Sequence, residues 1–337
     1  MQRLSLVPIL LLGACQSAHP LPPRFYVSLE RGNAVAEIDA ASGKLLRQIS
    51  VGMRPRGIRL APDGKTLFVT VSGSPIGGPG VDETKLPPPD HTADGIAVVD
   101  VASGKVDRVL QAGTDPEAFA LSDDGHTIFV SNEDSGTVSA IPVGTTNAAR
   151  RAKVGDEPEG VAVSADGTRL FVACEASDYV AMLDARTLAP RGTVPLKGRP
   201  RTLLRSRDGN TIFVAIEGAG KLAMLSAVDG KIIAVINLRT KDPDVRPMGM
   251  AESANGHLLV TTGRAGSILE VDPARRRVVR EIANVGARPW GIAFDRSGGL
   301  IATANGPSND VTILDARSGK IRAKVKAGAS PWGVVAS

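Results

Sequence analysis

The 337-residue sequence predicts an all-β fold, a seven-bladed β-propeller with four-stranded blades. Three observations lead to this prediction. A proline-centred triplet recurs seven times, turn signals follow it at a constant distance, and the two ends of the chain supply complementary parts of one repeat. The length is also compatible with two domains, but propellers of this size often form one.

The triplet has the form Pro-x-Gly or a close variant, and most copies are 42 residues apart. Its prolines are Pro55, Pro116, Pro158, Pro200, Pro247, Pro289 and Pro331. Eight residues after the proline, an Asp-Gly pair or a relative of it marks a hairpin turn. These pairs begin at Asp63, Asp124, Asp166, Asp208, Asn255 and Ser297. Each triplet is therefore expected to lie in the first strand of a blade.

A run with the composition of a β-strand follows each turn. The runs are Leu67–Thr70, Ile128–Ser131, Leu170–Ala173, Ile212–Ala215, Leu258–Thr261 and Leu300–Thr303. A period near 42 also occurs in helical arrays, but the β-branched runs, the Asp-Gly turns and the lack of long helical stripes exclude a helical array.

The chain ends explain how the ring closes. After Pro331 the chain continues only to Ser337, which is enough for the first strand of a seventh repeat. The runs Phe25–Ser28, Val35–Asp39 and Lys44–Ile49 match the second, third and fourth strands. One C-terminal and three N-terminal strands therefore complete the last blade of a single domain over residues 24–337, with no open sheet edge.

Residues 1–14 have the pattern of a signal peptide, with a basic start and an apolar run too short to span a bilayer. The following Cys15 stands where a bacterial lipobox has its lipidated cysteine, and residues 15–23 then form a proline-rich tether. The alternative is an ordinary signal peptide cleaved near Ala18. We expect a periplasmic protein anchored by lipid to the cell envelope, and Gln16 favours the outer membrane.

Composition excludes several classes of function. The net charge is +5, but basic and acidic residues are interspersed, whereas nucleic-acid binders cluster their basic residues. The chain has two cysteines, four histidines and no CxxC, HExxH, G-x-S-x-G or phosphate-loop motif. We expect a monomeric propeller without a cofactor, in contact with the membrane only through its lipid.

The runs Phe25–Ser28 and Leu67–Thr70, with the triplets and turns around them, resemble the YVTN β-propeller repeat family. The resemblance covers residues 24–337. The sequence is also similar to the branch of this family associated with PQQ-dependent alcohol catabolism in Gram-negative bacteria. That branch implies a non-catalytic accessory protein, which binds a periplasmic partner such as a dehydrogenase or cytochrome, or a small polar ligand. Propellers host many unrelated activities.

One face of the predicted ring carries the loops between second and third strands and the connections between blades. Two insertions fall on this face, 19 residues within residues 72–93 and five residues around residues 239–245. Long loops that interrupt a repeat often carry function. The alternative is neutral drift, because surface insertions cost little stability.

The same face is expected to present three sets of residues to a central funnel. The middle residues of the triplets are Arg56, Glu117, Glu159, Arg201, Met248, Trp290 and Trp332. The residues before the prolines are Arg54, Asp115, Glu157, Arg199, Arg246, Arg288 and Ser330. The second strands end at Glu30, Ser72, Glu133, Glu175, Glu217, Gly263 and Asn305. Carboxylates gather on the second and third blades and arginines on the fourth to sixth.

We select the ligand- or partner-binding candidates from these sets and add one histidine of the long insertion. They are Arg56, Glu117, Glu133, Glu159, Glu175, Arg201, Arg246, Arg288, Trp290, Trp332 and His91. Ion pairs between blades are the alternative use of the charges, and wedges between blades the alternative use of the tryptophans. The acidic residues are also weak candidates for binding calcium through oxygen ligands. Those candidates are Asp115, Glu117, Glu157 and Glu159.

A lactone hydrolase is the alternative function, because seven-bladed lactonases resemble this architecture. Glu117 or Glu159 would then be the general base and Arg201 would stabilise the oxyanion. His126 and His257 are expected to be solvated turn residues, and Cys174 a buried apolar residue. The main prediction remains a non-catalytic binding protein.

Overall fold

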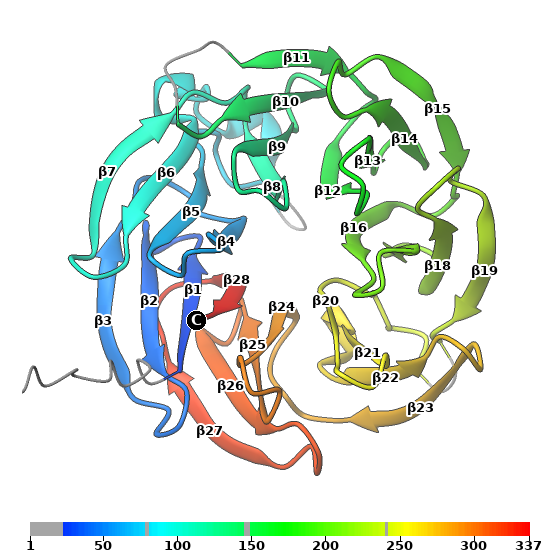
Figure 1. The fold of residues 1–337 in the computed structure, drawn as a ribbon. Coiled ribbons are helices and arrows are strands. Elements are labelled where there is room, and N and C mark those ends of the chain that lie inside the picture. Colours follow the sequence, from blue (N-terminus) through cyan, green and yellow to red (C-terminus); the bar gives the residue numbers. More distant parts are fainter. Residues whose placement is uncertain (1–22, 78–80, 145–148, 240–241) are drawn as a thin grey trace, which may run out of the picture.

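The computed structural model describes residues 23–77, 81–144, 149–239 and 242–337. The predicted signal peptide, Cys15 and most of the tether lie outside the described residues. The described strands form seven antiparallel four-stranded sheets, arranged as the blades of a ring (Figure 1). The seven-bladed propeller prediction is confirmed.

The blades follow one another along the chain. The first blade contains β4 (Ile58–Leu60), β5 (Thr66–Val71), β6 (Gly95–Asp100) and β7 (Lys105–Leu110). The second contains β8 (Pro116–Leu121), β9 (Thr127–Asn132), β10 (Thr137–Pro142) and β11 (Arg150–Lys153). The third contains β12 (Pro158–Val163), β13 (Arg169–Cys174), β14 (Tyr179–Asp184) and β15 (Pro190–Pro195). The fourth contains β16 (Pro200–Arg205), β17 (Thr211–Ile216), β18 (Lys221–Ser226) and β19 (Ile232–Asn237).

The fifth blade contains β20 (Met250–Glu252), β21 (Leu258–Thr261), β22 (Ile268–Asp272) and β23 (Arg277–Ile282). The sixth contains β24 (Pro289–Phe294), β25 (Leu300–Asn305), β26 (Asp310–Asp315) and β27 (Ile321–Lys326). The described helices are 3-10 turns, η1 (Glu83–Lys85), η2 (His91–Ala93) and η3 (Gly263–Ala265). In the part of the chain that the structure describes, no helix has the length and apolar character needed to cross a membrane.

The seventh, closing blade contains both ends of the described chain. It orders β28 (Pro331–Ala336), β1 (Arg24–Leu29), β2 (Ala34–Asp39) and β3 (Leu45–Ser50) from the centre outward. Strands β1 and β28 are antiparallel, with Phe25 opposite Ala336 and Tyr26 opposite Val335. The predicted closure of the ring by one C-terminal and three N-terminal strands is confirmed.

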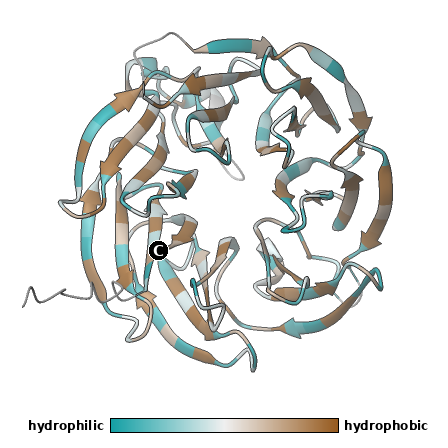
Figure 2. Cartoon of the chain, in the orientation of Figure 1, coloured by the Kyte–Doolittle hydropathy of each residue, from teal (hydrophilic) through white to brown (hydrophobic). Residues whose placement is uncertain are grey.

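The core lies between successive blades. Second strands such as β5 are almost entirely buried, whereas the outermost strands alternate or are largely exposed. Figure 2 shows long hydrophobic segments on the middle strands and alternating character on the outer strands. Because each blade packs against a neighbour on both faces, its middle strands need apolar residues on both faces.

The triplet glycines let the innermost strands approach one another. A Cβ atom placed on Gly160 would lie 2.4 Å from the carbonyl oxygen of Arg201, the middle triplet residue of the next blade. Gly249 has the same relation to Trp290, at 2.3 Å. Close backbone packing around the centre therefore requires a residue without a side chain.

A side-chain hydroxyl near the end of the second strand donates a hydrogen bond to the carbonyl oxygen of the middle triplet residue in the next blade. Thr70 Oγ1 donates to the Glu117 carbonyl oxygen at 2.7 Å, and Thr261 Oγ1 donates to that of Trp290 at 2.7 Å. Ser28 Oγ donates to the carbonyl oxygen of Arg56 at 2.6 Å. The Ser or Thr that closes these sequence runs thus links one blade to the funnel residue of the next.

Candidate functional site

A cavity of about 1380 Å³ lies at the funnel end of the ring, and residues of all seven blades line it. The residue before each triplet proline lines it in every repeat. Six of these residues have a positive φ between 44° and 65°: Arg54, Asp115, Glu157, Arg199, Arg288 and Ser330. Non-glycine residues rarely adopt this backbone, and such conformations cluster at functional sites.

The middle triplet residues line the cavity too, with one exception. Met248 is 2 % exposed and belongs to the hydrophobic core instead. Of the residues at second-strand ends, the glutamates Glu30, Glu133, Glu175 and Glu217 line the cavity. Ser72 is fully buried and does not line the cavity, and its hydroxyl donates to Asp115 at 2.6 Å.

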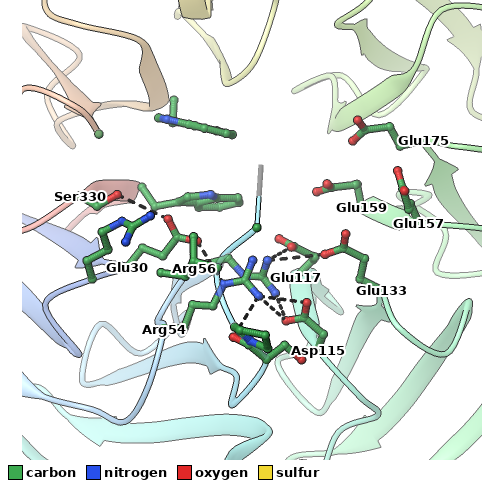
Figure 3. A pocket seen from close by; sticks show the side chains of 18 of the residues that line it. Glu30, Arg54, Arg56, Asp115, Glu117, Glu133, Glu157, Glu159, Glu175 and Ser330 are labelled. Carbon is green, nitrogen blue, oxygen red and sulfur yellow. Dashed lines mark hydrogen bonds and ion pairs between the residues drawn. The ribbon is translucent and has the colours of Figure 1, made fainter. Parts of the chain in front are cut away.

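One cluster of charges surrounds Arg56, which is 2 % exposed (Figure 3). Its guanidinium forms ion pairs with Asp115 and Glu117 and lies 3.6 Å from Glu133. The neighbouring Arg54 pairs with Glu30 at 3.2 Å and with Asp115 at 3.1 Å. Although burial raises the pKa of Asp115, both arginines lower it, so it stays below its ordinary value.

The long insertion between β5 and β6 is joined to this cluster. The Asp94 carboxylate accepts hydrogen bonds from the backbone N–H of Gly73 at 2.8 Å and of Asp115 at 3.1 Å. His91 Nδ1 lies 2.8 Å from the same carboxylate. His91 is not one of the lining residues, whereas Ser74 to Gly77 and Leu86 to Pro89 of the insertion are.

A second cluster surrounds Arg201 on the fourth blade. Its guanidinium lies 2.8 Å from Glu159, 2.9 Å from Glu175 and 3.2 Å from Glu217. Arg199 also pairs with Glu175. The interblade ion pairs that were the alternative use of these charges are therefore present. Figure 3 shows Glu157, Glu159 and Glu175 together, across the view from Arg54.

Glu159 is the carboxyl group of this cluster with the strongest upward shift. Burial raises its pKa, Arg201 lowers it, and the neighbouring Glu175 and Glu133 raise it again, so that the pKa lies well above its ordinary value. Burial also raises the pKa of Glu157. A carboxyl group with a raised pKa exchanges a proton nearer neutral pH than an exposed glutamate does.

The two tryptophans of the chain lie together in the cavity. The rings of Trp290 and Trp332 are stacked, with centroids 6.0 Å apart and planes 23° from parallel. The Trp290 centroid is also 5.2 Å from the guanidinium carbon of Arg201 and 4.8 Å from that of Arg288. Stacked indoles flanked by cations present an apolar platform for a small ligand.

Three carboxylates of the first cluster have the spacing of a metal site. Oxygen atoms of Asp115, Glu117 and Glu133 lie within 4.8 Å of one another. The Arg56 guanidinium contacts all three and already supplies positive charge there. A bound cation would have to displace Arg56. The other two calcium candidates, Glu157 and Glu159, belong to the second cluster, so calcium binding stays a prediction.

Sequence reasoning missed some residues of the site. Arg264 of η3 lines the cavity, but it lies one position beyond the expected end of the second strand. Arg31, at the equivalent position of the closing blade, also lines it, so this repeat position could have identified both residues.

His257, expected to be solvated, instead lies 2.7 Å from Glu270 outside the funnel. Cys174 is buried as expected, and burial raises the pKa of its thiol to about 12.

Comparison with known proteins identifies the fold alone. No family model and no curated protein sequence matches this chain. Among solved structures, a periplasmic gluconolactonase of Pseudomonas aeruginosa is 22% identical, with 93% of this chain and 98% of that chain covered and a TM-score of 0.71. A putative 6-phosphogluconolactonase of Bacteroides uniformis is 16% identical, with coverage of 94% and 99% and a TM-score of 0.73.

A more distant structural similarity is to an enzyme of another class, a lyase. A catalytically inactive variant of virginiamycin B lyase of Staphylococcus aureus is 13% identical, with 92% of each chain covered and a TM-score of 0.66. These structural neighbours are seven-bladed propellers. Membership of the YVTN family and of its PQQ-associated branch stays a prediction.

Proposed function

We propose that this protein is a lactone hydrolase whose reaction takes place at Glu159 and Arg201. This function was the alternative, rather than the main prediction, of the sequence. The observation that carries it is a buried carboxyl group with a raised pKa, held 2.8 Å from a guanidinium inside a large cavity. A base and an oxyanion-stabilising cation are the two groups that ester hydrolysis requires.

Glu159 is the better base of the two candidates. Glu117 is paired with Arg56, whose side chain is 2 % exposed, so its charge is compensated inside the wall of the funnel. Burial and the neighbouring carboxylates of Glu175 and Glu133 raise the pKa of Glu159 well above its ordinary value, although Arg201 lowers it. A proton is therefore more favourable on Glu159 than on an exposed carboxylate.

The proposed lactone hydrolysis has two steps, attack by water and opening of the ring. Ionised Glu159 removes a proton from a water molecule, whose oxygen bonds to the lactone carbonyl carbon, and Arg201 stabilises the negative charge on the carbonyl oxygen. The bond from the carbonyl carbon to the ring oxygen then breaks, and the ring oxygen takes the proton from Glu159. One lactone and one water give one hydroxy acid.

The structural neighbours support this reaction class. Two solved propellers that share the fold over nearly the whole chain are named as gluconolactonase and putative 6-phosphogluconolactonase. The names describe those proteins. For this chain the support lies in Glu159 and Arg201, because one fold serves many reactions.

The test is lactone hydrolysis by purified protein, followed by acid release from a panel of five- and six-membered lactones. We expect Glu159→Gln to reduce turnover about 10² to 10⁴ fold, because the amide cannot accept the proton. Glu281→Gln, on the exposed face of β23, is the matched control and should keep wild-type turnover.

Two results would contradict the proposal. Wild-type turnover in Glu159→Gln would exclude the assigned base. Absence of hydrolysis by the wild-type protein for every lactone of the panel would refute the reaction, and a stoichiometric protein partner recovered from the cell envelope would then return the function to binding.

A further inference from the structure

The funnel contains a group of arginines that form no close ion pair within the described chain. Arg246, Arg264 and Arg288 line the cavity, yet none of them takes part in an ion pair within 4.0 Å among the described residues. By contrast, Arg54, Arg56, Arg199 and Arg201 each pair with at least one carboxylate. Positive charge in a cavity without internal compensation favours an anionic ligand.

One of these guanidiniums has an unused donor inside the protein. The NH1 atom of Arg246 is buried and has no hydrogen-bond partner. A buried donor without a partner costs roughly 1 to 3 kcal/mol, and more when the group is charged. This atom is enclosed by protein, so a ligand anion would contact Arg246 through the part of its side chain that lines the cavity.

The three arginines belong to two neighbouring blades of the ring, Arg246 and Arg264 to the fifth and Arg288 to the sixth. The Arg246 N–H donates to the Thr262 carbonyl oxygen at 2.9 Å, which ties Arg246 to the turn that carries Arg264. Burial lowers the pKa of Arg288, and Arg201 and Arg264 lower it further through charge repulsion, whereas Glu217 and Glu30 raise it; the net effect is a lowering. An anion placed among like charges relieves their repulsion.

We propose that Arg246, Arg264 and Arg288 form an anion-binding subsite of the funnel, which takes a carboxylate or phosphate group of a small ligand. Guanidiniums bind both groups through paired N–H donors. The part of the inference that names the substrate rests on the proposed function: the substrate is then a lactone that carries an anionic substituent.

The tryptophan platform connects this subsite to the reacting groups. Arg288 lies 4.8 Å and Arg201 lies 5.2 Å from the centroid of Trp290. Both guanidiniums therefore lie over the same indole, and one small molecule beside them in the cavity can place its carbonyl group at Arg201 and its anionic group at Arg288. The cavity of about 1380 Å³ has room for such a ligand.

The position of the two tryptophans allows ligand binding to be measured directly. Both of its tryptophans line this cavity, so intrinsic fluorescence reports on the subsite without a label. The probes are gluconate as the carboxylate, inorganic phosphate as the phosphate, and glucose as a neutral sugar. We expect saturable fluorescence changes with at least one anion, weakening as salt is raised, and none with glucose.

Substitutions distinguish a loss of anion binding at the subsite from a loss of proton transfer in the reaction. Arg246→Gln and Arg264→Gln should each weaken anion binding by roughly tenfold or more, while preserving the fold. Arg277→Gln, on the exposed strand β23, is the matched control and should bind as the wild type does. Glu159→Gln should still bind the anion, because its defect lies in proton transfer.

The titrations with gluconate and with inorganic phosphate identify whether the subsite prefers a carboxylate or a phosphate group. Binding of neither anion, or equal binding by Arg246→Gln, Arg264→Gln and the wild type, would overturn the subsite even if lactones are hydrolysed. Anion binding without hydrolysis of any lactone would leave the subsite and refute the proposed reaction. The two failures are therefore distinguishable.

Discussion

Glu159 has its chemical character because of where its side chain lies. The residue is 5 % exposed, and burial is the largest of the influences that raise its pKa. Arg201 opposes the rise, and Glu175 and Glu133 add to it. The same residue type on an outer strand would be an ordinary solvated carboxylate.

This difference leads to a prediction about pH. A general base acts only in its ionised form, so we expect kcat/KM to rise with pH through the raised pKa of Glu159, above the range of an exposed glutamate. Rates measured from about pH 4 to pH 9 test it. Glu281→Gln should keep the rising limb, whereas a wild-type profile already flat from about pH 5 would argue against Glu159 as the base.

At the scale of elements, the second strand of a blade both packs the core and positions the funnel. Its apolar residues fill the spaces between blades, and its terminal hydroxyl fixes a carbonyl group of the next blade. The strand thereby sets the position of the triplet residue whose side chain enters the cavity. The motif that identifies the fold in the sequence is also part of the support of the site.

Thr70→Val tests this support, because valine keeps the shape of the side chain and removes the hydroxyl. The Glu117 carbonyl oxygen then loses its 2.7 Å hydrogen bond in a buried place. We expect the free energy of unfolding to fall by about 1 to 3 kcal/mol in urea titrations.

The matched control is Thr127→Val at the half-exposed start of β9. We expect this change to stay within about 0.5 kcal/mol of the wild type. If both variants were equally stable, the hydroxyl would have no part in holding neighbouring blades together.

At the scale of the whole molecule, the ring depends on a pairing between the ends of the described chain. Strand β28 is the innermost strand of the closing blade and also carries Trp332 of the platform. Its pairing with β1 links residues about three hundred positions apart in the sequence. Stability and the complete funnel therefore depend on the same short segment.

Deletion of Pro331 to Ser337 should expose an edge of β1 and open the ring. We expect an unfolding temperature lower by roughly 10 °C or more in calorimetry, together with aggregation. A variant with a flexible extension after Ser337 controls for disturbance of the chain end and should unfold like the wild type. Wild-type unfolding of the deletion variant would show that β28 does not stabilise the ring.

The period of the triplets, the Asp-Gly turns and the incomplete repeats at the two ends predicted the number of blades, the strands and the closure. These features are visible in the sequence because each blade is a local unit with its own turns and strands. Repeat alignment also identified most lining residues, since equivalent positions of each blade meet at the centre. It missed Arg31 and Arg264, which lie just beyond the aligned positions.

Only the tertiary structure decided which charges neutralise one another. Arg56 and Arg201 occupy equivalent triplet positions, but Arg56 pairs with carboxylates of the following blade, whereas Arg201 pairs with Glu159 and Glu175 of the preceding blade. Arg246 and Arg288 occupy the repeat position of Arg54 and Arg199, yet neither forms an ion pair within the described structure. The repeat determines which positions face the funnel, whereas pairing across blades depends on distances that the linear order of residues does not contain.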